Sequence, residues 1–119
     1  MKKTFKYFLI GIVGGAVLVS LLFGHFDRSV DELKPIYAGG PSDFIEIMGM
    51  EVHYRDEGNP LDSVPVVLIH GTGSSLHTFD AWTAALKEDR RVVRMDLPGF
   101  GLTGPFPDRN YSMEQYVDF

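Results

Sequence analysis

Cysteine is absent from this sequence of 119 residues. Its absence excludes disulfide bonds and metal sites built on thiolates, and it is compatible with an exported protein without showing export. Basic residues are scarce beyond the first 28 positions, because residues 29–119 carry 7 basic and 15 acidic side chains, a net charge of −8. A surface that binds nucleic acid needs a basic face to displace counterions from phosphates. We therefore expect no nucleic-acid partner.

A nucleophile motif is also missing, since no G-x-S-x-G or G-x-D-x-G pentapeptide occurs anywhere in the sequence. Such a pentapeptide would place a nucleophile on a sharp turn between a strand and a helix. Ser74 and Ser75 lie in a glycine-rich stretch but in no such motif. We interpret both serines as hydrogen-bonding residues of a loop and of the start of a helix.

One long apolar run without charges is present near the N-terminus, over Tyr7–Gly24. Eighteen helical residues extend about 27 Å, close to the ~30 Å thickness of the hydrocarbon layer of a bilayer. A cleaved signal peptide needs small residues before the cut, whereas this run ends in Leu21-Leu22-Phe23-Gly24. We predict an uncleaved, single-pass transmembrane signal anchor. A cleaved signal peptide and a buried helix of a soluble protein are the alternatives.

The sequence around this run divides into segments. Residues 1–6 form a basic start whose lysines predict a cytoplasmic N-terminus, with the globular part in the periplasm or outside the cell. Residues 25–41 are interpreted as a juxtamembrane linker with a short helix over 29–34, broken at Pro35. The globular part then comprises residues 42–119.

The globular part opens with two predicted strands, over residues 44–48 and 50–56, joined by a tight turn at Gly49. In the second strand, apolar and charged residues alternate. This alternation is typical of a strand with one face in the core and the other in solvent. It places His53 on the outward face, and we interpret His53 as a solvated surface histidine.

A βαβ unit follows. Four consecutive aliphatic residues, Val66–Ile69, are typical of a parallel strand that is covered on both faces. A helix is predicted from about Thr78, with Phe79, Trp82 and Leu86 at helical spacing, followed by a strand over 91–95. Strand, helix and strand in this order predict an α/β fold in which the sheet becomes parallel. Further along, Ser112-Met113-Glu114-Gln115 fits the capping box of another helix.

Motifs at the two parallel strand ends carry a resemblance to a known family. The first strand ends in His70-Gly71-Thr72-Gly73 and the second in Asp96-Leu97-Pro98-Gly99-Phe100-Gly101. In this order they closely resemble the α/β-hydrolase superfamily, and most of all its cofactor-free branch of C–C bond hydrolases, epoxide hydrolases and haloalkane dehalogenases. The resemblance implies the N-terminal portion of an α/β-hydrolase sheet, an incomplete domain with an antiparallel hairpin and a parallel βαβ unit, that needs no cofactor and no metal.

The resemblance also implies a role for each motif. Ester-like chemistry places negative charge on an oxygen, which backbone N–H donors stabilise. In this family one donor matches Thr72, and Gly73 is the second choice; a plain strand-to-helix turn is the alternative. The resemblance makes Asp96 a residue that fixes its turn through backbone N–H groups. The implied loop-supporting residues are His70, Gly71, Asp96, Gly99 and Gly101. From its place on the helix, Trp82 is most simply a packing residue, and a pocket-lining role is the alternative.

The nucleophile, the acid and the catalytic histidine follow these motifs in the chain order of this family, so we expect all three beyond residue 119. The leading hypothesis is a membrane-anchored hydrolase of a small ester-like or C–C bond substrate, acting through a covalent intermediate. An aspartate nucleophile would instead open epoxides or displace halide. A non-catalytic, anchored binding module is the alternative. In the resembling family, the strand that matches Val66–Ile69 pairs with the strand that carries the nucleophile, and without that partner its edge is unpaired. We therefore interpret the chain as a fragment or truncated product that is inactive alone.

Overall fold

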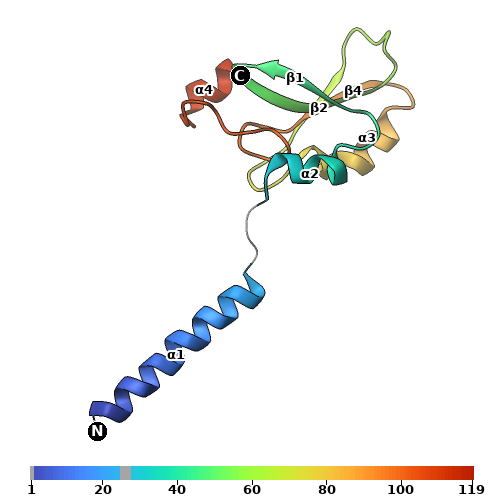
Figure 1. Ribbon diagram of the computed structural model, residues 1–119. Helices are drawn as coiled ribbons and strands as arrows, with labels where there is room; N and C mark the ends of the chain where they lie inside the picture. Colours follow the sequence, from blue (N-terminus) through green and yellow to red (C-terminus); the bar gives the residue numbers. More distant parts are fainter. Residues whose placement is uncertain (1, 25–27) are drawn as a thin grey trace.

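The computed structural model describes residues 2–24 and 28–119 (Figure 1). Met1 of the predicted basic start and residues 25–27 of the predicted linker lie outside the described residues. The elements in chain order are α1 (Lys2–Phe23), α2 (Val30–Tyr37), β1 (Ser42–Ile47), β2 (Met50–Gly58), β3 (Val66–Ile69), the 3₁₀ helix η1 (Leu76–Phe79), α3 (Asp80–Leu86), β4 (Arg91–Met95) and α4 (Met113–Asp118).

The strands form one mixed sheet in the order β1-β2-β4-β3. β1 and β2 are antiparallel and are joined through Met48 and Gly49, whose φ angles are 52° and 75°. Two consecutive positive φ angles are typical of the tight hairpin turn that matches the twist of the strands. β4 pairs antiparallel with β2 and parallel with β3. The sheet therefore contains the predicted hairpin and the predicted parallel unit.

A small apolar core lies on one face of β2. Met50 and Val52 pack there with Phe106, which is fully buried, and Tyr116 and Phe119 close the cluster from the α4 side. Burying a side chain of this size contributes about 1.5–3 kcal/mol. The loop after β4 therefore returns across the hairpin and fixes β2 relative to β4.

The capping of α4 departs from the predicted capping box. The Ser112 hydroxyl accepts a hydrogen bond from the Gln115 N–H at 3.3 Å, as predicted. The Ser112 N–H, however, donates to the Asn110 side-chain oxygen rather than to Gln115. The Gln115 side chain accepts from the Asn110 amide instead. Asn110 thus replaces the second half of the box.

The other face of β2 is buried as well, so the prediction of a solvated His53 is wrong. His53 is 0% exposed and Arg55 is 9% exposed. Helix α2, η1 and the start of α3 lie against this face, where Arg55 contacts Tyr37 and His53 lies near His77. The alternation in β2 therefore separates an apolar core from a buried polar network, not a core from solvent.

Strand β3 is less covered than its aliphatic sequence predicts. Val66 and Leu68 are half-buried, but Val67 and Ile69 are 50% and 61% exposed. β3 is the last strand of the sheet, so one of its edges has no strand beside it among residues 28–119. The expected cover on both faces is therefore not present in this chain.

The helix after β3 starts earlier than predicted and in two parts. A 3₁₀ turn over Leu76–Phe79 precedes α3, and its tighter winding changes which side chains face the sheet. Leu76 and Thr83 are buried, whereas Trp82 is 66% exposed. Of the predicted apolar stripe, Phe79 and Leu86 are half-buried, and only Trp82 is exposed.

Helix α1 stands apart from the sheet (Figure 1). Its segment Thr4–Phe23 has a mean hydropathy of 2.1 and is 0% buried, and it is the single helix among the described residues with the length and composition to cross a membrane. Helix α2 begins as predicted, with a complete capping box between Ser29 and Glu32. It continues past Pro35, where a break was predicted, to Tyr37, whose carbonyl accepts from Arg55 and lies 3.1 Å from His77 Nε2.

Candidate functional site

The two motifs meet at the carboxyl edge of the parallel strands. Ile69 of β3 pairs with Met95 of β4, so the residues that follow, His70 and Asp96, leave the sheet side by side. Both side chains are buried, with 4% and 1% of their surface exposed. The sheet register thus places the glycine-rich loop next to the turn that starts at Asp96.

His70 joins the two motifs through both of its ring nitrogens. The Leu97 N–H donates to Nε2 at 3.0 Å, and Nδ1 lies 2.9 Å from the Gly71 carbonyl oxygen. Because Nε2 accepts from a backbone N–H, the proton of the ring resides on Nδ1 and is donated to Gly71. The ring also meets the edge of Phe100. With both nitrogens engaged, His70 braces the loop and is not available to shuttle protons.

Asp96 organises the neighbouring turn. Its Oδ1 accepts from the Leu76 N–H at 2.7 Å, and its Oδ2 accepts from the Leu102 N–H at 2.8 Å. Oδ2 also accepts from His53 Nδ1 at 2.7 Å. Burial acts to raise the pKa of this carboxyl, but the hydrogen bonds from His53, Leu102 and Leu76 outweigh burial and hold the pKa below its usual range. Asp96 is therefore an ionised acceptor that ties three segments together.

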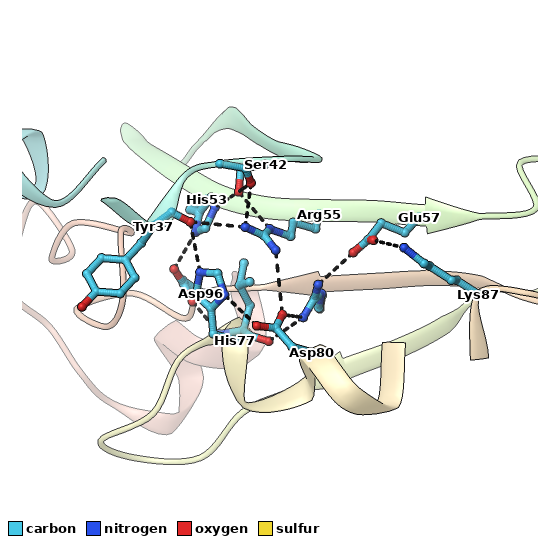
Figure 2. Close-up of polar contacts among 12 residues, drawn as sticks. Tyr37, Ser42, His53, Arg55, Glu57, His77, Asp80, Lys87 and Asp96 are labelled. Atoms are coloured by element: carbon cyan, nitrogen blue, oxygen red, sulfur yellow. Dashed lines mark hydrogen bonds and ion pairs between the residues drawn. The ribbon is translucent and has the colours of Figure 1, made fainter. Parts of the chain in front are cut away.

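His53 is the member of the site that the sequence analysis missed. Its Nδ1 contacts Asp96, and its Nε2 lies 2.8 Å from the Ser42 hydroxyl (Figure 2). Its backbone N–H donates to the Thr103 hydroxyl. A signal was available, because a βαβ unit implies a sheet with helices over its faces. Polar residues of an inner strand then need hydrogen-bond partners within the protein, even where the alternation of the sequence predicts a solvent-facing side.

The glycine-rich loop after β3, unlike the Asp96 turn, leaves backbone N–H groups without hydrogen-bond partners in the described part of the chain. Thr72 and Gly73 are exposed, and within residues 28–119 no group accepts a hydrogen bond from either backbone N–H. Nothing lies within 4 Å of where a Cβ would stand at Gly71 or Gly73. Further along, the Ser74 hydroxyl bonds the Thr78 hydroxyl. Two backbone N–H groups on exposed residues are therefore left without a partner in this part of the chain.

The glycines of the second turn are confined in contrast. Gly99 and Gly101 have φ angles of 81° and 53°. A Cβ on Gly101 would stand 2.1 Å from Asp96 Oδ2, inside the contact distance of any atom pair. The Gly99 N–H donates to the Gly104 carbonyl at 2.9 Å. This turn therefore requires glycine at residue 101 for the close approach of the carboxylate.

Relatives of known activity share this architecture. A haloalkane dehalogenase from Psychrobacter cryohalolentis is 36% identical over 72 residues, which are 59% of this chain and 23% of that protein. A 2-hydroxy-6-oxo-6-(2'-aminophenyl)hexa-2,4-dienoic acid hydrolase from Metapseudomonas resinovorans is 32% identical over 77 residues, 62% of this chain and 25% of that protein. The chain thus spans about a quarter of the length of these curated relatives. No family model matches the sequence.

Solved structures agree with these relatives. The Cif epoxide hydrolase from Acinetobacter nosocomialis is 32% identical, with a TM-score of 0.62 over 75% of this chain and 29% of that one. The chain belongs to the α/β-hydrolase superfamily. A membrane phospholipase A is 23% identical, with a TM-score of 0.60 over 99% of this chain and 38% of that one, and shows the fold alone.

The predicted site residues of this α/β-hydrolase chain fall into two adjoining loops and one separate position. The glycine-rich loop and the Asp96 turn bring together His70, Gly71, Thr72, Gly73, Asp96, Gly99 and Gly101. Trp82 lies outward on α3 and lines none of the cavities identified among residues 28–119. Its pocket-lining role therefore stays a prediction, as does the oxyanion role of the loop.

Proposed function

We propose that this chain is the N-terminal portion of a membrane-anchored α/β-hydrolase that acts on a small ester-like or C–C bond substrate. The nucleophile, the acid and the catalytic histidine of the parent protein lie beyond residue 119 in this proposal. Its relatives include a dehalogenase, a C–C bond hydrolase and an epoxide hydrolase, all about four times as long as the matched region. An aspartate nucleophile would direct the same site to epoxides or halides.

The backbone N–H groups of Thr72 and Gly73, two exposed residues, have no acceptor within residues 28–119, and this observation carries the proposal. They stand at the carboxyl edge of the sheet, on a loop whose base is fixed by the bond between Leu97 and His70. Backbone donors in fixed positions stabilise an oxyanion without reorganising during the reaction. In the proposed enzyme Thr72 donates the first hydrogen bond to the oxyanion, Gly73 is the second choice, and the residue after the nucleophile supplies the other donor.

Two substitutions of Thr72 in the parent protein test this role. Thr72→Pro removes the backbone donor, and we expect kcat to fall about 10²–10³-fold, the usual loss for one oxyanion donor. Thr72→Ala removes the side chain but keeps the N–H, and we expect kcat within about threefold of wild type. Both variants are assayed on p-nitrophenyl esters, with a fluorophosphonate probe to count intact serine nucleophiles.

The result also separates the proposed enzyme from a binding module. Equal loss of kcat in both Thr72 variants would show that the side chain, not the amide, matters, and the oxyanion role would be abandoned. A parent chain with neither serine nor aspartate in the nucleophile motif, and with no turnover of esters, epoxides or haloalkanes, would show a non-catalytic module instead.

The proposed anchor assigns residues 1–6 to the cytoplasm, 7–24 to the bilayer and 25–41 to a linker, with the partial hydrolase domain over 42–119 outside the cytoplasm. It is supported by the length, hydropathy and full exposure of α1. We expect the protein to stay in the membrane pellet after alkaline carbonate extraction, and a chain without residues 2–24 to appear in the supernatant. Extraction of the intact chain by carbonate would contradict the anchor.

A further inference from the structure

Helix α2 is joined to the hydrolase domain by polar contacts rather than by apolar burial. Across Val30–Tyr37 no side chain is buried. A pocket of about 200 Å³ is lined by Leu33 and Tyr37 of this helix and by His77 and Leu102 of the domain. Apolar burial is the main source of docking energy in most interfaces, and α2 has no fully buried side chain to supply it. The docking of α2 therefore depends on its hydrogen bonds and ion pairs.

Cationic side chains of the domain bind the C-terminal end of α2 (Figure 2). An Arg55 guanidinium nitrogen donates to the Tyr37 carbonyl at 3.2 Å and to the Gly39 carbonyl at 2.8 Å. His77 Nε2 lies 3.1 Å from the same Tyr37 carbonyl. Positive charge at a helix C-terminus is favourable, because the last carbonyls have no partner within the helix. In the last turn of α2, Lys34 also forms an ion pair with Glu51 of β2.

The two partners of His77 are both acceptors. Nε2 faces the Tyr37 carbonyl, and Nδ1 lies 3.1 Å from Asp80 Oδ2. Burial acts to raise the pKa of the Asp80 carboxyl, but hydrogen bonds from Arg94 and His77 lower it below its usual range, so Asp80 is an ionised acceptor. A neutral imidazole has one N–H and one lone pair. His77 can therefore donate to both partners only when it is doubly protonated.

His53, the other histidine of this region, differs in this respect. Its Nδ1 donates to Asp96, while its Nε2 faces the Ser42 hydroxyl, which can donate or accept. Neutral and charged His53 can therefore both keep two hydrogen bonds. His77 alone of the two must lose a bond when it loses its proton. The charged or titratable groups that face His77 from the elements packed against it are Tyr37, His53, Arg55, Asp80, Arg94 and Asp96.

We propose that His77 is a pH-operated latch that holds helix α2, and with it the segment leading from the membrane helix, against the hydrolase domain. Histidine is the side chain whose charge ordinarily changes between about pH 5 and 8. Because the His77 proton adds one hydrogen bond to the docked state, docking is strongest at the acidic end and weakens as the pH rises. Release of α2 frees the tether between α1 and the sheet, independently of the proposed hydrolase activity.

The absence of cysteine allows a direct distance measurement on the full chain. Ile36→Cys on α2 and Glu88→Cys after α3, both exposed positions, carry two spin labels in detergent micelles. We expect a single short distance at about pH 5.5, and at about pH 8 a second, longer and broader component. The ratio of docked to released molecules should fall about ten- to a hundredfold, the effect of one lost hydrogen bond to a charged group.

Two variants at residue 77 give opposite end states. His77→Arg keeps a positive donor at every pH, and we expect the docked distance at both pH values. His77→Gln has no charge to lose, and we expect the released component at both. The fluorescence of Trp82, the only tryptophan, shows whether each variant is folded. A wild-type distance that does not change with pH, or a pH dependence that persists in both variants, would overturn the latch.

Discussion

The glycine-rich loop and the Asp96 turn leave neighbouring ends of the same parallel strand pair, yet their backbones are bound in opposite ways. In the Asp96 turn, one buried carboxylate accepts from Leu76, Leu102 and His53. In the loop, the Thr72 and Gly73 amides point to no acceptor among residues 28–119. The turn is therefore closed by its own hydrogen bonds, whereas the loop leaves two backbone donors without a partner among these residues.

His70 connects these two regions. It receives the Leu97 N–H from the turn and donates to Gly71 in the loop. The first residues of the loop are thus fixed to the base, while its exposed part lies beyond the brace. An oxyanion donor has to stand in a defined position before the reaction begins. The contrast between the regions meets this need, because rigidity is supplied by one and accessibility by the other.

Asp96→Ala tests how much of the base depends on one carboxylate, and we expect the largest effect. The substitution leaves two backbone N–H groups and a buried histidine without their acceptor. Unsatisfied buried donors cost about 1–3 kcal/mol each, so we expect a loss of about 3–5 kcal/mol in the free energy of unfolding. Urea unfolding of the full chain in mild detergent, followed by Trp82 fluorescence, measures it.

Asp89→Ala provides the matched control, since Asp89 is an exposed carboxylate just before β4. We expect its free energy of unfolding to stay within about 0.5 kcal/mol of wild type. A loss at Asp96 no larger than that at Asp89 would show that the turn is fixed by other contacts, and the contrast between rigid base and open loop would fail.

The sequence predicted the path of the backbone better than the environment of its side chains. The hairpin around Gly49, the parallel pair and both glycine motifs were legible because each depends on local turn chemistry or on strand periodicity. The role of Asp96 in fixing its turn was inferred from its place before Pro98, and the structure adds the distant partners Leu76 and His53. Contacts between distant segments leave no local pattern.

His53 and Trp82 show where that reasoning stops. Alternation in β2 separated apolar from polar residues correctly, but it could not tell solvent from a buried network formed by α2 and α3. A 3₁₀ turn precedes α3, so the side chains that face the sheet differ from those that uniform helical spacing predicts. Trp82 therefore faces outward. Both errors arise from packing between elements, which is a property of the assembled fold.

A pair of glycine substitutions compares the two regions at equal backbone conformation. Gly101 and Gly73 have φ angles of 53° and 72°, so alanine is strained at both by about 1–2 kcal/mol. At Gly101 the new Cβ would also collide with Asp96 Oδ2. We expect Gly101→Ala to lower the free energy of unfolding by about 2–4 kcal/mol, measured by the same urea titration.

Gly73→Ala isolates the backbone contribution, because open space surrounds the position of its Cβ. We therefore expect the smallest effect, about 1–2 kcal/mol, from the left-handed conformation alone. The difference between the two variants measures the close approach of the Asp96 carboxylate. If Gly73→Ala proves as costly as Gly101→Ala, the loop is as tightly fixed as the turn, and its amides are not the accessible donors that the proposed hydrolase requires.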